Sequence, residues 1–189
     1  MLPVRGCSFS GYRPEKFSFS LTVGSAGRAL LERALDREIT AAADDGITDF
    51  YCGCAKGFDI LAGEAVIRMK AIRPGIRLIC VMPYESMVKD WEPEWRARLF
   101  DITSECDEKI TLSSSYHRGV FHQRNKYLIE HSEMLIAFYD GKSGGTESTL
   151  ALAEKKGIRT VNIAEGVNAE AISAPYRRYY IAEPPEAKQ

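Results

Sequence analysis

A glycine turn near the end of the chain carries the first sign of ligand chemistry. The segment YDGKSGGTESTLALA (residues 139–153) follows an apolar, strand-like run and leads into a helix-like run. Gly144 and Gly145 would let backbone N–H groups approach a ligand closely, and the N-terminus of a helix favours an anion. The hydroxyl of Thr146 could cap the helix or donate to a phosphate oxygen. Because many strand-to-helix turns are simply glycine-rich, this segment indicates a phosphate site only together with other features.

A second turn of the same kind lies earlier in the chain. The stretch CGCAKGFDILAGE (residues 52–64) places Gly53, Ala55 and Gly57 in a short loop that opens a helix. Small residues again allow backbone N–H groups to approach a ligand. Asp59 lies in the first helical turn, where it could either complement the helix dipole or accept hydrogen bonds from a ribose. The stretch is neither a Walker loop nor the Gly-x-Gly-x-x-Gly dinucleotide fingerprint.

Charged side chains accompany these turns. Arg13 lies beside Gly11 in the loop SGYRPEK (residues 10–16), after the first strand-like run. A guanidinium forks onto two oxygens and suits phosphate, although a solvated loop arginine is the plain alternative. Arg124 lies on a predicted helix, and Asp140 follows the strand-like run that precedes the glycine turn. In an open parallel sheet ligands bind beyond the carboxyl ends of the strands, so the residues that follow each strand are the candidates.

The loop after the third strand-like run is rich in aromatic residues. In MPYESMVKDWEPEW (residues 82–95), Pro83 and Tyr84 could form the wall of a pocket. Trp91 and Trp95 are one helical turn apart, which is more typical of a packed pair than of a platform for stacking a base, although both interpretations stay open.

The cysteines and histidines do not indicate a metal site. The five cysteines have no disulfide framework, and the pair Cys52 and Cys54 lacks a second ligand pair at zinc-like spacing. His122 and His131 do not form the i, i+4 pair of a zinc helix. We therefore predict no metal and no cofactor.

Strand-like and helix-like segments alternate along the chain, and these elements must position the candidate residues. Such alternation predicts an α/β fold with an open, mostly parallel sheet, helices on both faces and right-handed crossovers. The run IRLICVMP is apolar throughout, which is typical of a strand buried on both faces. The predicted strands are residues 4–10, 47–52, 76–83, 108–112, 133–139 and 159–163, and the predicted helices are residues 25–46, 57–71, 90–104, 121–131 and 147–156.

Length and composition limit the broad class of protein to which the chain can belong. With 189 residues, 45% of them hydrophobic and 27% charged, the chain is expected to form one domain with a real core. A net charge of −1 gives no support for a nucleic-acid binder. We expect a cytoplasmic protein, since neither a signal peptide nor a membrane-spanning run is apparent. We assign residues 1–165 to the domain and residues 166–189, which lack clear periodicity, to a partly frayed extension.

Several of these segments occur in an order known from one family. CSFSGYRPEK, GCAKGFDILAGE, HQRNKYLIEHSEMLIAFYDG and SGGTESTLALA resemble segments of YpsA-like proteins of the SLOG superfamily, and the resemblance extends from residue 5 to about residue 163. It implies a Rossmann-like fold. The wider superfamily includes the LOG phosphoribohydrolases and the DNA-processing DprA proteins, and several members are thought to sense nucleotide-derived ligands.

The resemblance to LOG enzymes can be followed residue by residue. Those enzymes carry an Arg-Lys pair on a helix and, after a strand, Pro-Gly-Gly-x-Gly-Thr-x-x-Glu. Arg124 matches the arginine, and Asn125 stands at the lysine position. Gly145 and Thr146 match the Gly-Thr, but Thr149 stands where the catalytic glutamate would be. The resemblance thus implies that the phosphate-holding part is kept and that the acid is replaced.

These features together predict a protein that binds a nucleotide or a nucleotide-derived small molecule, and the resemblance implies a role as a sensor of it. One alternative is a phosphoribohydrolase in which Asp59, Asp140 or Glu147 supplies the missing acid. A second is a nucleic-acid-binding module like DprA, for which the aromatic and basic run YRRYY (residues 176–180) is the local support. We expect no nucleic acid and no membrane as partners, and the LOG analogy allows a homodimer. The predicted ligand-binding residues are Gly11, Arg13, Gly53, Ala55, Gly57, Asp59, Pro83, Arg124, Asn125, Asp140, Gly144, Gly145 and Thr146.

Overall fold

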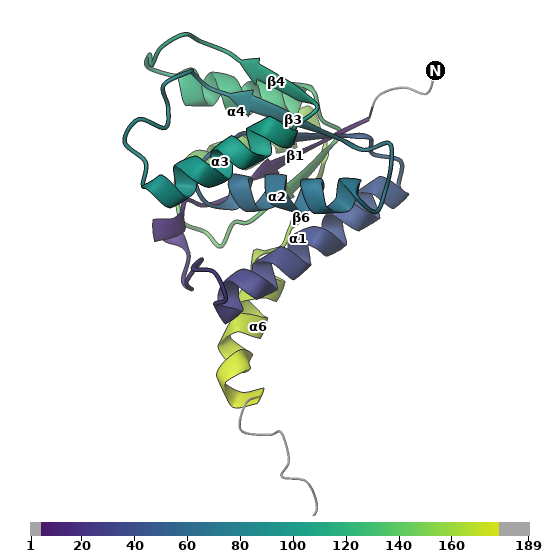
Figure 1. Ribbon diagram of the computed structural model, residues 1–189. Helices are drawn as coiled ribbons and strands as arrows, with labels where there is room; N and C mark the ends of the chain where they lie inside the picture. Colours follow the sequence, from purple (N-terminus) through teal and green to yellow (C-terminus); the bar gives the residue numbers. More distant parts are fainter. Residues whose placement is uncertain (1–4, 178–189) are drawn as a thin grey trace, which may run out of the picture.

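A computed structural model describes residues 5–177 of the chain and contains one parallel β-sheet (Figure 1). Six strands lie in the order β4-β3-β2-β1-β5-β6, and each neighbouring pair is parallel. This confirms the predicted α/β fold with a Rossmann-like sheet. The strands are β1 (Gly6–Ser10), β2 (Asp49–Cys52), β3 (Arg77–Met82), β4 (Glu108–Thr111), β5 (Met134–Ala137) and β6 (Arg159–Asn162).

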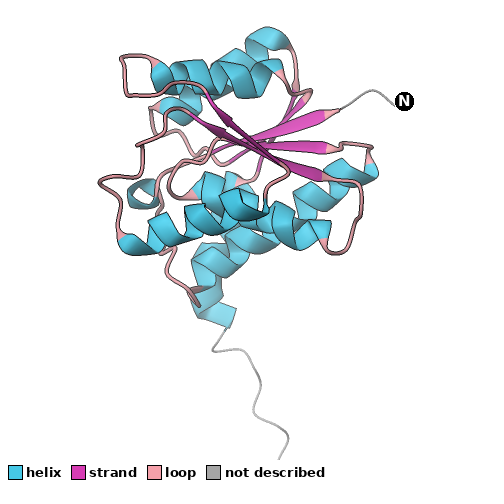
Figure 2. Cartoon of the chain, turned by 45° about the horizontal axis from the view of Figure 1, so that its top comes forward, coloured by secondary structure: helices cyan, strands magenta, loops and turns pink. Residues whose placement is uncertain are grey.

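Helices cover both faces of the sheet (Figure 2). One face packs against α1 (Ala26–Asp44), α2 (Phe58–Lys70), α3 (Pro93–Glu105) and α6 (Ala164–Arg177). The other face packs against α4 (Val120–Glu130) and α5 (Gly145–Lys156), and a short 3₁₀ turn, η1 (Pro14–Lys16), follows β1.

Burial along the strands explains why the sequence forms this sheet. The central strands β1, β2 and β5 are buried along their whole length, and β3 is buried from its second residue onward. The edge strands β4 and β6 are mostly exposed and carry charged and polar residues. Strands covered on both faces are mostly apolar, although β1 and β2 also bury Ser8, Ser10 and Asp49. Edge strands need not be apolar, which is why β4 gives the weaker sequence pattern.

The helix ends follow local chemistry. Ser25 caps α1, because its side-chain oxygen accepts a hydrogen bond from the backbone N–H of Arg28 at 3.3 Å. Helix α3 begins at Pro93, three residues later than predicted, since proline is suited to the first helical position. Trp91 therefore lies before the helix and Trp95 within it, so the two tryptophans do not share a helix.

The chain changes direction across the sheet at β1. From β1 it proceeds through β2 and β3 to β4, and it then returns to place β5 on the opposite side of β1. Helices α1 to α3 and helices α4 and α5 consequently lie on opposite faces. A crevice opens between the carboxyl ends of β1 and β5 at such a reversal, and this is where open α/β sheets bind ligands.

The region after β6 differs from the sequence expectation. Helix α6 follows β6 directly and packs against α1 (Figure 1), with Ala164 and Val167 buried in the main core. The segment AEPPEAKQ and residues 178–180 of YRRYY lie outside the described residues.

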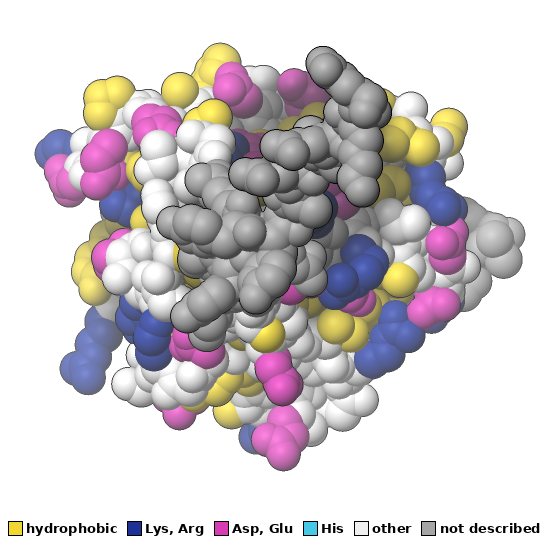
Figure 3. All heavy atoms as spheres, turned by 90° about the horizontal axis from the view of Figure 1, so that it is seen from below, with side chains coloured by type: hydrophobic (Ala, Val, Ile, Leu, Met, Phe, Trp, Pro, Cys, Tyr) yellow, Lys and Arg dark blue, Asp and Glu magenta, His cyan; other side chains and the backbone are white. Residues whose placement is uncertain are grey.

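Charges are mixed on the surface below α1 and α6. Figure 3 shows basic and acidic side chains interspersed over the visible described part of this face. Within residues 5–177, no helix is both long enough and apolar enough to cross a membrane.

Candidate functional site

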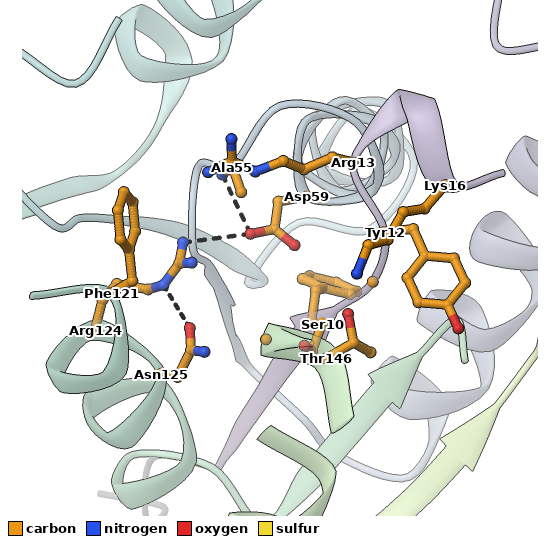
Figure 4. Close-up of a pocket in the computed structure, with 13 residues that line it drawn as sticks. Ser10, Tyr12, Arg13, Lys16, Ala55, Asp59, Phe121, Arg124, Asn125 and Thr146 are labelled. Atoms are coloured by element: carbon orange, nitrogen blue, oxygen red, sulfur yellow. Dashed lines mark hydrogen bonds and ion pairs between the residues drawn. The ribbon is translucent and has the colours of Figure 1, made fainter. Parts of the chain in front are cut away.

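A cavity of about 280 Å³ lies at the carboxyl end of β1, where the sheet order reverses (Figure 4). The loop after β1, the turn before α2, the first turns of α4 and the start of α5 enclose it. Its lining residues are Phe9, Ser10, Gly11, Tyr12, Arg13, Lys16, Ala55, Asp59, Phe121, Arg124, Asn125, Gly145 and Thr146.

A buried ion pair forms one wall of this cavity. The Asp59 carboxylate oxygen Oδ2 lies 3.5 Å from Arg124 Nη1, and both side chains are less than 10% exposed. The same oxygen accepts a hydrogen bond from the backbone N–H of Ala55 at 3.2 Å. Arg124 also donates to the Gly53 carbonyl, and its Nε donates to Asn125 Oδ1 at 2.8 Å. The pair thus joins the turn before α2 to helix α4.

Burial dominates the electrostatics of Asp59. Desolvation raises the pKa of this carboxyl from 3.8 to about 7, although the positive charges of Arg124 and Arg13 and the hydrogen bond from Ala55 act in the opposite direction. An electrostatic contribution from the nearby Cys52 side chain adds to the increase in the pKa. Asp59 is therefore a carboxyl that can gain or lose its proton near neutral pH.

Glycine is required at position 53 because two charged groups approach the backbone there. A Cβ atom on Gly53 would lie 2.4 Å from Arg124 Nη1 and 2.7 Å from Asp59 Oδ2. Gly57 has a φ of +99°, and a Cβ there would lie 2.6 Å from the Tyr12 carbonyl oxygen. The left-handed backbone at position 57 thus favours glycine, whereas at position 53 a side chain would have to displace Arg124 and Asp59.

Two backbone N–H groups at the turn before α2 already donate hydrogen bonds within the protein. The N–H of Ala55 donates to Asp59, and the N–H of Phe58 donates to the Tyr12 carbonyl at 3.0 Å. The predicted role of residues 53–57, phosphate binding through backbone N–H groups, thus has fewer free donors than the glycines alone indicate.

The start of α5 offers donors that are free. Gly144 precedes the helix with a φ of +145°, and Gly145 and Thr146 face the cavity. Within the described chain, the backbone N–H groups of Gly145 and Thr146 have no acceptor, as expected for the first residues of an α-helix. The Thr146 hydroxyl likewise has no protein partner among the described residues, although its residue is only 6% exposed.

Two further cations face the same space. Arg13 is exposed, has no carboxylate partner among the described residues, and lies over the Phe121 ring at 5.9 Å from its centroid. Lys16 Nζ donates to the carbonyl of Ser143 at 2.7 Å, just before the start of α5. With Arg124, the lining carries three cations against the single carboxylate of Asp59. This balance favours an anionic ligand.

Tyr12 fixes the loop between β5 and α5, a role that sequence reasoning missed. Its hydroxyl donates to Asp140 Oδ1 at 2.8 Å and accepts the backbone N–H groups of Asp140 and Lys142, both at 3.0 Å. Asp140 also lies 3.5 Å from Lys142 Nζ and accepts from Asn168 at 3.4 Å. Asp140 thus turns toward these partners and does not line the cavity.

A second cavity of about 320 Å³ adjoins the first. The two share Arg13, Ala55, Phe121 and Arg124. The remaining lining residues of the second cavity are Gly53, Lys56, Pro83, Tyr84, Met87, Asp90 and Trp91.

The structure brings most of the predicted site residues together. Those that line the first cavity are Gly11, Arg13, Ala55, Asp59, Arg124, Asn125, Gly145 and Thr146. Gly53 and Pro83 line the second cavity, whereas Gly57, Asp140 and Gly144 line neither. Ser10, Tyr12 and Lys16 were missed although they share the loop of Arg13, and no sequence signal marked Phe121.

The positions of Thr149 and Glu147 show whether the start of α5 supplies a carboxylate to the cavity. Thr149 is completely buried, and its hydroxyl donates to the Gly145 carbonyl at 2.8 Å. Glu147 is exposed and lines neither cavity. Neither residue therefore places a carboxylate in the site, and Asp59 is the acid that the described lining supplies.

Two solved structures of DNA processing protein A share this fold. DprA of Streptococcus pneumoniae aligns with a TM-score of 0.54 and 16% identity, over 92% of this chain and 56% of that chain. DprA of Helicobacter pylori aligns with a TM-score of 0.50 and 17% identity, over 88% of this chain and 81% of that chain. Its structure comes from a study of its single-stranded DNA binding mode. This chain thus spans just over half of the first protein. At these identities the likeness establishes the fold alone.

Sequence relatives and a family model are more specific. UPF0398 protein BH1768 of Halalkalibacterium halodurans is 24% identical over 152 residues, which are 79% of this chain and 80% of that protein. A UPF0398 protein of Bacillus thuringiensis is 26% identical over 149 residues, which are 78% of this chain and 80% of that protein. The YpsA family model, described as the YspA SLOG family, matches residues 7–164, which is most of the chain. The protein therefore belongs to the YpsA family of SLOG proteins.

Proposed function

We propose that this protein binds a nucleotide or nucleotide-derived small molecule, with its phosphate at the start of α5. One observation carries the proposal: the backbone N–H groups of Gly145 and Thr146, which have no acceptor among the described residues, face a cavity that Arg13 and Lys16 also line. A helix N-terminus and flexible cations complement a phosphate, because donors and positive charge converge on the same oxygens. Membership of the SLOG group is consistent with nucleotide-related binding in general.

The sugar of such a ligand would lie against Asp59 and Asn125. Asp59 Oδ2 is held by Ala55 and Arg124, and its second oxygen has no protein donor among the described residues. Asn125 accepts from Arg124 through Oδ1, and its amide N–H groups have no acceptor within residues 5–177, so they can donate to a ligand. Ribose hydroxyls both donate and accept, so they match this pair of side chains. The volume of about 280 Å³ is close to the lower limit of ligand sites, about 300 Å³.

Thermal unfolding in the presence of AMP, ADP-ribose or NAD tests the proposal. A ligand that binds the folded state alone raises the melting temperature, by mass action. No increase with any of the three at millimolar concentration would contradict the proposal.

A variant pair tests where the phosphate binds. Arg13→Ala removes a charge-assisted hydrogen bond and should weaken AMP binding by about 10- to 150-fold in calorimetry. Arg33→Ala, at an exposed position on α1 outside both cavities, should leave the affinity unchanged. Equal affinities for AMP and adenosine would mean that no phosphate is recognised.

A phosphoribohydrolase is the second candidate function, and Asp59 is the observation that favours it. Cleavage of an N-glycosidic bond builds positive charge on the ribose, which a positioned carboxylate stabilises. Asp59 lines the cavity, and its pKa of about 7 leaves a share of it ionised at neutral pH. This hypothesis predicts release of free base from a nucleoside 5′-monophosphate, detected by chromatography. Asp59→Asn should abolish the release and Glu147→Gln should not. If no base appears over a broad panel of nucleotides, the hypothesis is wrong.

We expect no binding of nucleic acid, although DprA shares the fold. The net charge is −1, and charges of both signs are interspersed on the face that Figure 3 presents. A phosphate backbone attracts proteins through concentrated positive charge, which makes such binding weaken steeply with salt. A salt-dependent gel shift of single-stranded DNA would contradict this expectation.

We place the protein in the cytoplasm, where thiols stay reduced. All five cysteines are free, and four of them are buried.

A homodimer is the oligomeric state that the LOG analogy suggests, and light scattering would test it.

A further inference from the structure

The second cavity lies beside the proposed phosphate site and opens onto the same residues. Arg13, Ala55, Phe121 and Arg124 line both spaces, so they form the boundary at which the cavities meet. Figure 4 shows the Phe121 side chain at one end of the first cavity and Lys16 and Tyr12 at the other. The start of α5 and the second cavity are therefore approached from different ends of the first cavity.

The two ends differ in chemistry. Free backbone N–H groups and Lys16 mark the α5 end. Aromatic rings mark the other end: Tyr84 and Phe121 lie with centroids 6.0 Å apart and planes at 70°, and half-buried Trp91 lines the same space. Met87 and Pro83 add buried apolar surface to this cavity. A flat ring with polar edges matches such walls, because aromatic faces bind one another through dispersion and offset or edge contacts.

We propose, building on the proposed function, that the second cavity binds the aromatic base of the nucleotide whose phosphate lies at α5. The ligand is then a nucleoside 5′-phosphate that spans the boundary formed by Arg13, Ala55, Phe121 and Arg124. Its ribose passes Asp59, and its base occupies the space that Tyr84, Trp91 and Phe121 line. Base stacking on aromatic side chains is sequence-tolerant, since every base has a π-face. The cavity thus recognises the class of ligand, an aromatic base carried on a sugar phosphate.

Calorimetry with AMP and ribose 5-phosphate separates this proposal from the proposed function. Ribose 5-phosphate retains the groups for the α5 end and lacks the base, so AMP should bind more tightly. Tyr84→Leu and Trp91→Leu should each weaken AMP binding by about 5- to 150-fold, the range measured for loss of one stacking partner. Both variants should bind ribose 5-phosphate as the natural protein does, and that affinity also reports that the variant is folded.

Tyr116→Leu is the matched control. Tyr116 is 63% exposed and contacts both Tyr84 and Phe121, with centroids 5.8 and 6.3 Å away, but it lines neither cavity. Its replacement should leave both affinities unchanged.

Tryptophan fluorescence gives a second readout. The chain has two tryptophans, so Trp95→Phe leaves Trp91 as the single emitter. Saturating AMP should change the emission of Trp91, and saturating ribose 5-phosphate should change it much less.

The outcomes distinguish the two proposals. If AMP and ribose 5-phosphate bind equally and the Tyr84 and Trp91 variants lose nothing, the base does not enter the second cavity, and the phosphate site still stands. If neither compound binds the natural protein, this inference is wrong, and the proposed function then depends on whether ADP-ribose or NAD binds.

Discussion

Replacing Asp59 by asparagine should change how the stability of the protein depends on pH. Asp59 is 5% exposed, and its burial raises the pKa of the carboxyl to about 7. Asparagine has nearly the same shape and can still accept the N–H of Ala55, but it does not ionise. The comparison therefore isolates the ionisation of one buried group.

The sign and size of the change in stability with pH follow from the linkage between protonation of Asp59 and folding. In the unfolded chain Asp59 loses its proton near its ordinary pKa of 3.8, whereas in the folded chain it does so near 7. Below the lower value both states are protonated and ionisation has no effect. Between the two values the folded state binds more protons, so stability falls as the pH rises, and above about 7 the loss is complete. The separation of the two pKa values corresponds to about 4 kcal/mol in total, of which about 2.5 kcal/mol falls between pH 5 and pH 8.

Urea unfolding of the natural protein and of Asp59→Asn at several pH values measures this effect. The free energy of unfolding of the variant, relative to the natural protein, should rise by about 2.5 kcal/mol from pH 5 to pH 8. Asp101→Asn, an exposed position on α3, should give a profile parallel to that of the natural protein. A difference between the natural protein and Asp59→Asn that stays constant over this range would refute the burial argument.

Three further substitutions follow from the geometry of the turns. Gly53→Ala places a Cβ 2.4 Å from Arg124 Nη1, so it should lower the free energy of unfolding by about 1–3 kcal/mol in urea titrations, and an unchanged value would contradict the close approach. Gly145→Ala adds a Cβ with no described protein atom within 4 Å, so it should leave stability unchanged and weaken AMP binding in calorimetry; unchanged affinity would argue against a phosphate at this backbone. Tyr12→Phe leaves the N–H groups of Asp140 and Lys142 without their acceptor and should cost about 1–3 kcal/mol, whereas a neutral effect in the same titrations would show that this hydroxyl does not hold the loop.

The sequence predicted the sheet because each strand has a local signature. The central strands are buried on both faces, so their apolar runs stand out between helices with recurring apolar residues. Helix α6 was missed although its apolar residues recur with a helical period. The packing of Ala164 and Val167 against the core stabilises it, and that contact depends on tertiary structure.

The candidate site could be predicted in part for the same reason. Parallel strands bring their carboxyl ends to one edge, so Arg13, Asp59 and Thr146 were expected near one another, and all three line the first cavity. The partners of each residue could not be foreseen. The pairing of Asp59 with Arg124 joins residues 65 positions apart, and the bond from Tyr12 to Asp140 spans 128.

A crystal structure of the protein soaked with AMP is the most direct test of the central claim, phosphate binding at the start of α5. We predict phosphate oxygens within about 2.7–3.2 Å of the backbone nitrogens of Gly145 and Thr146. Arg13 or Lys16 should contact the same phosphate. Density for the phosphate at the turn before α2, or anywhere outside the first cavity, would contradict the claim.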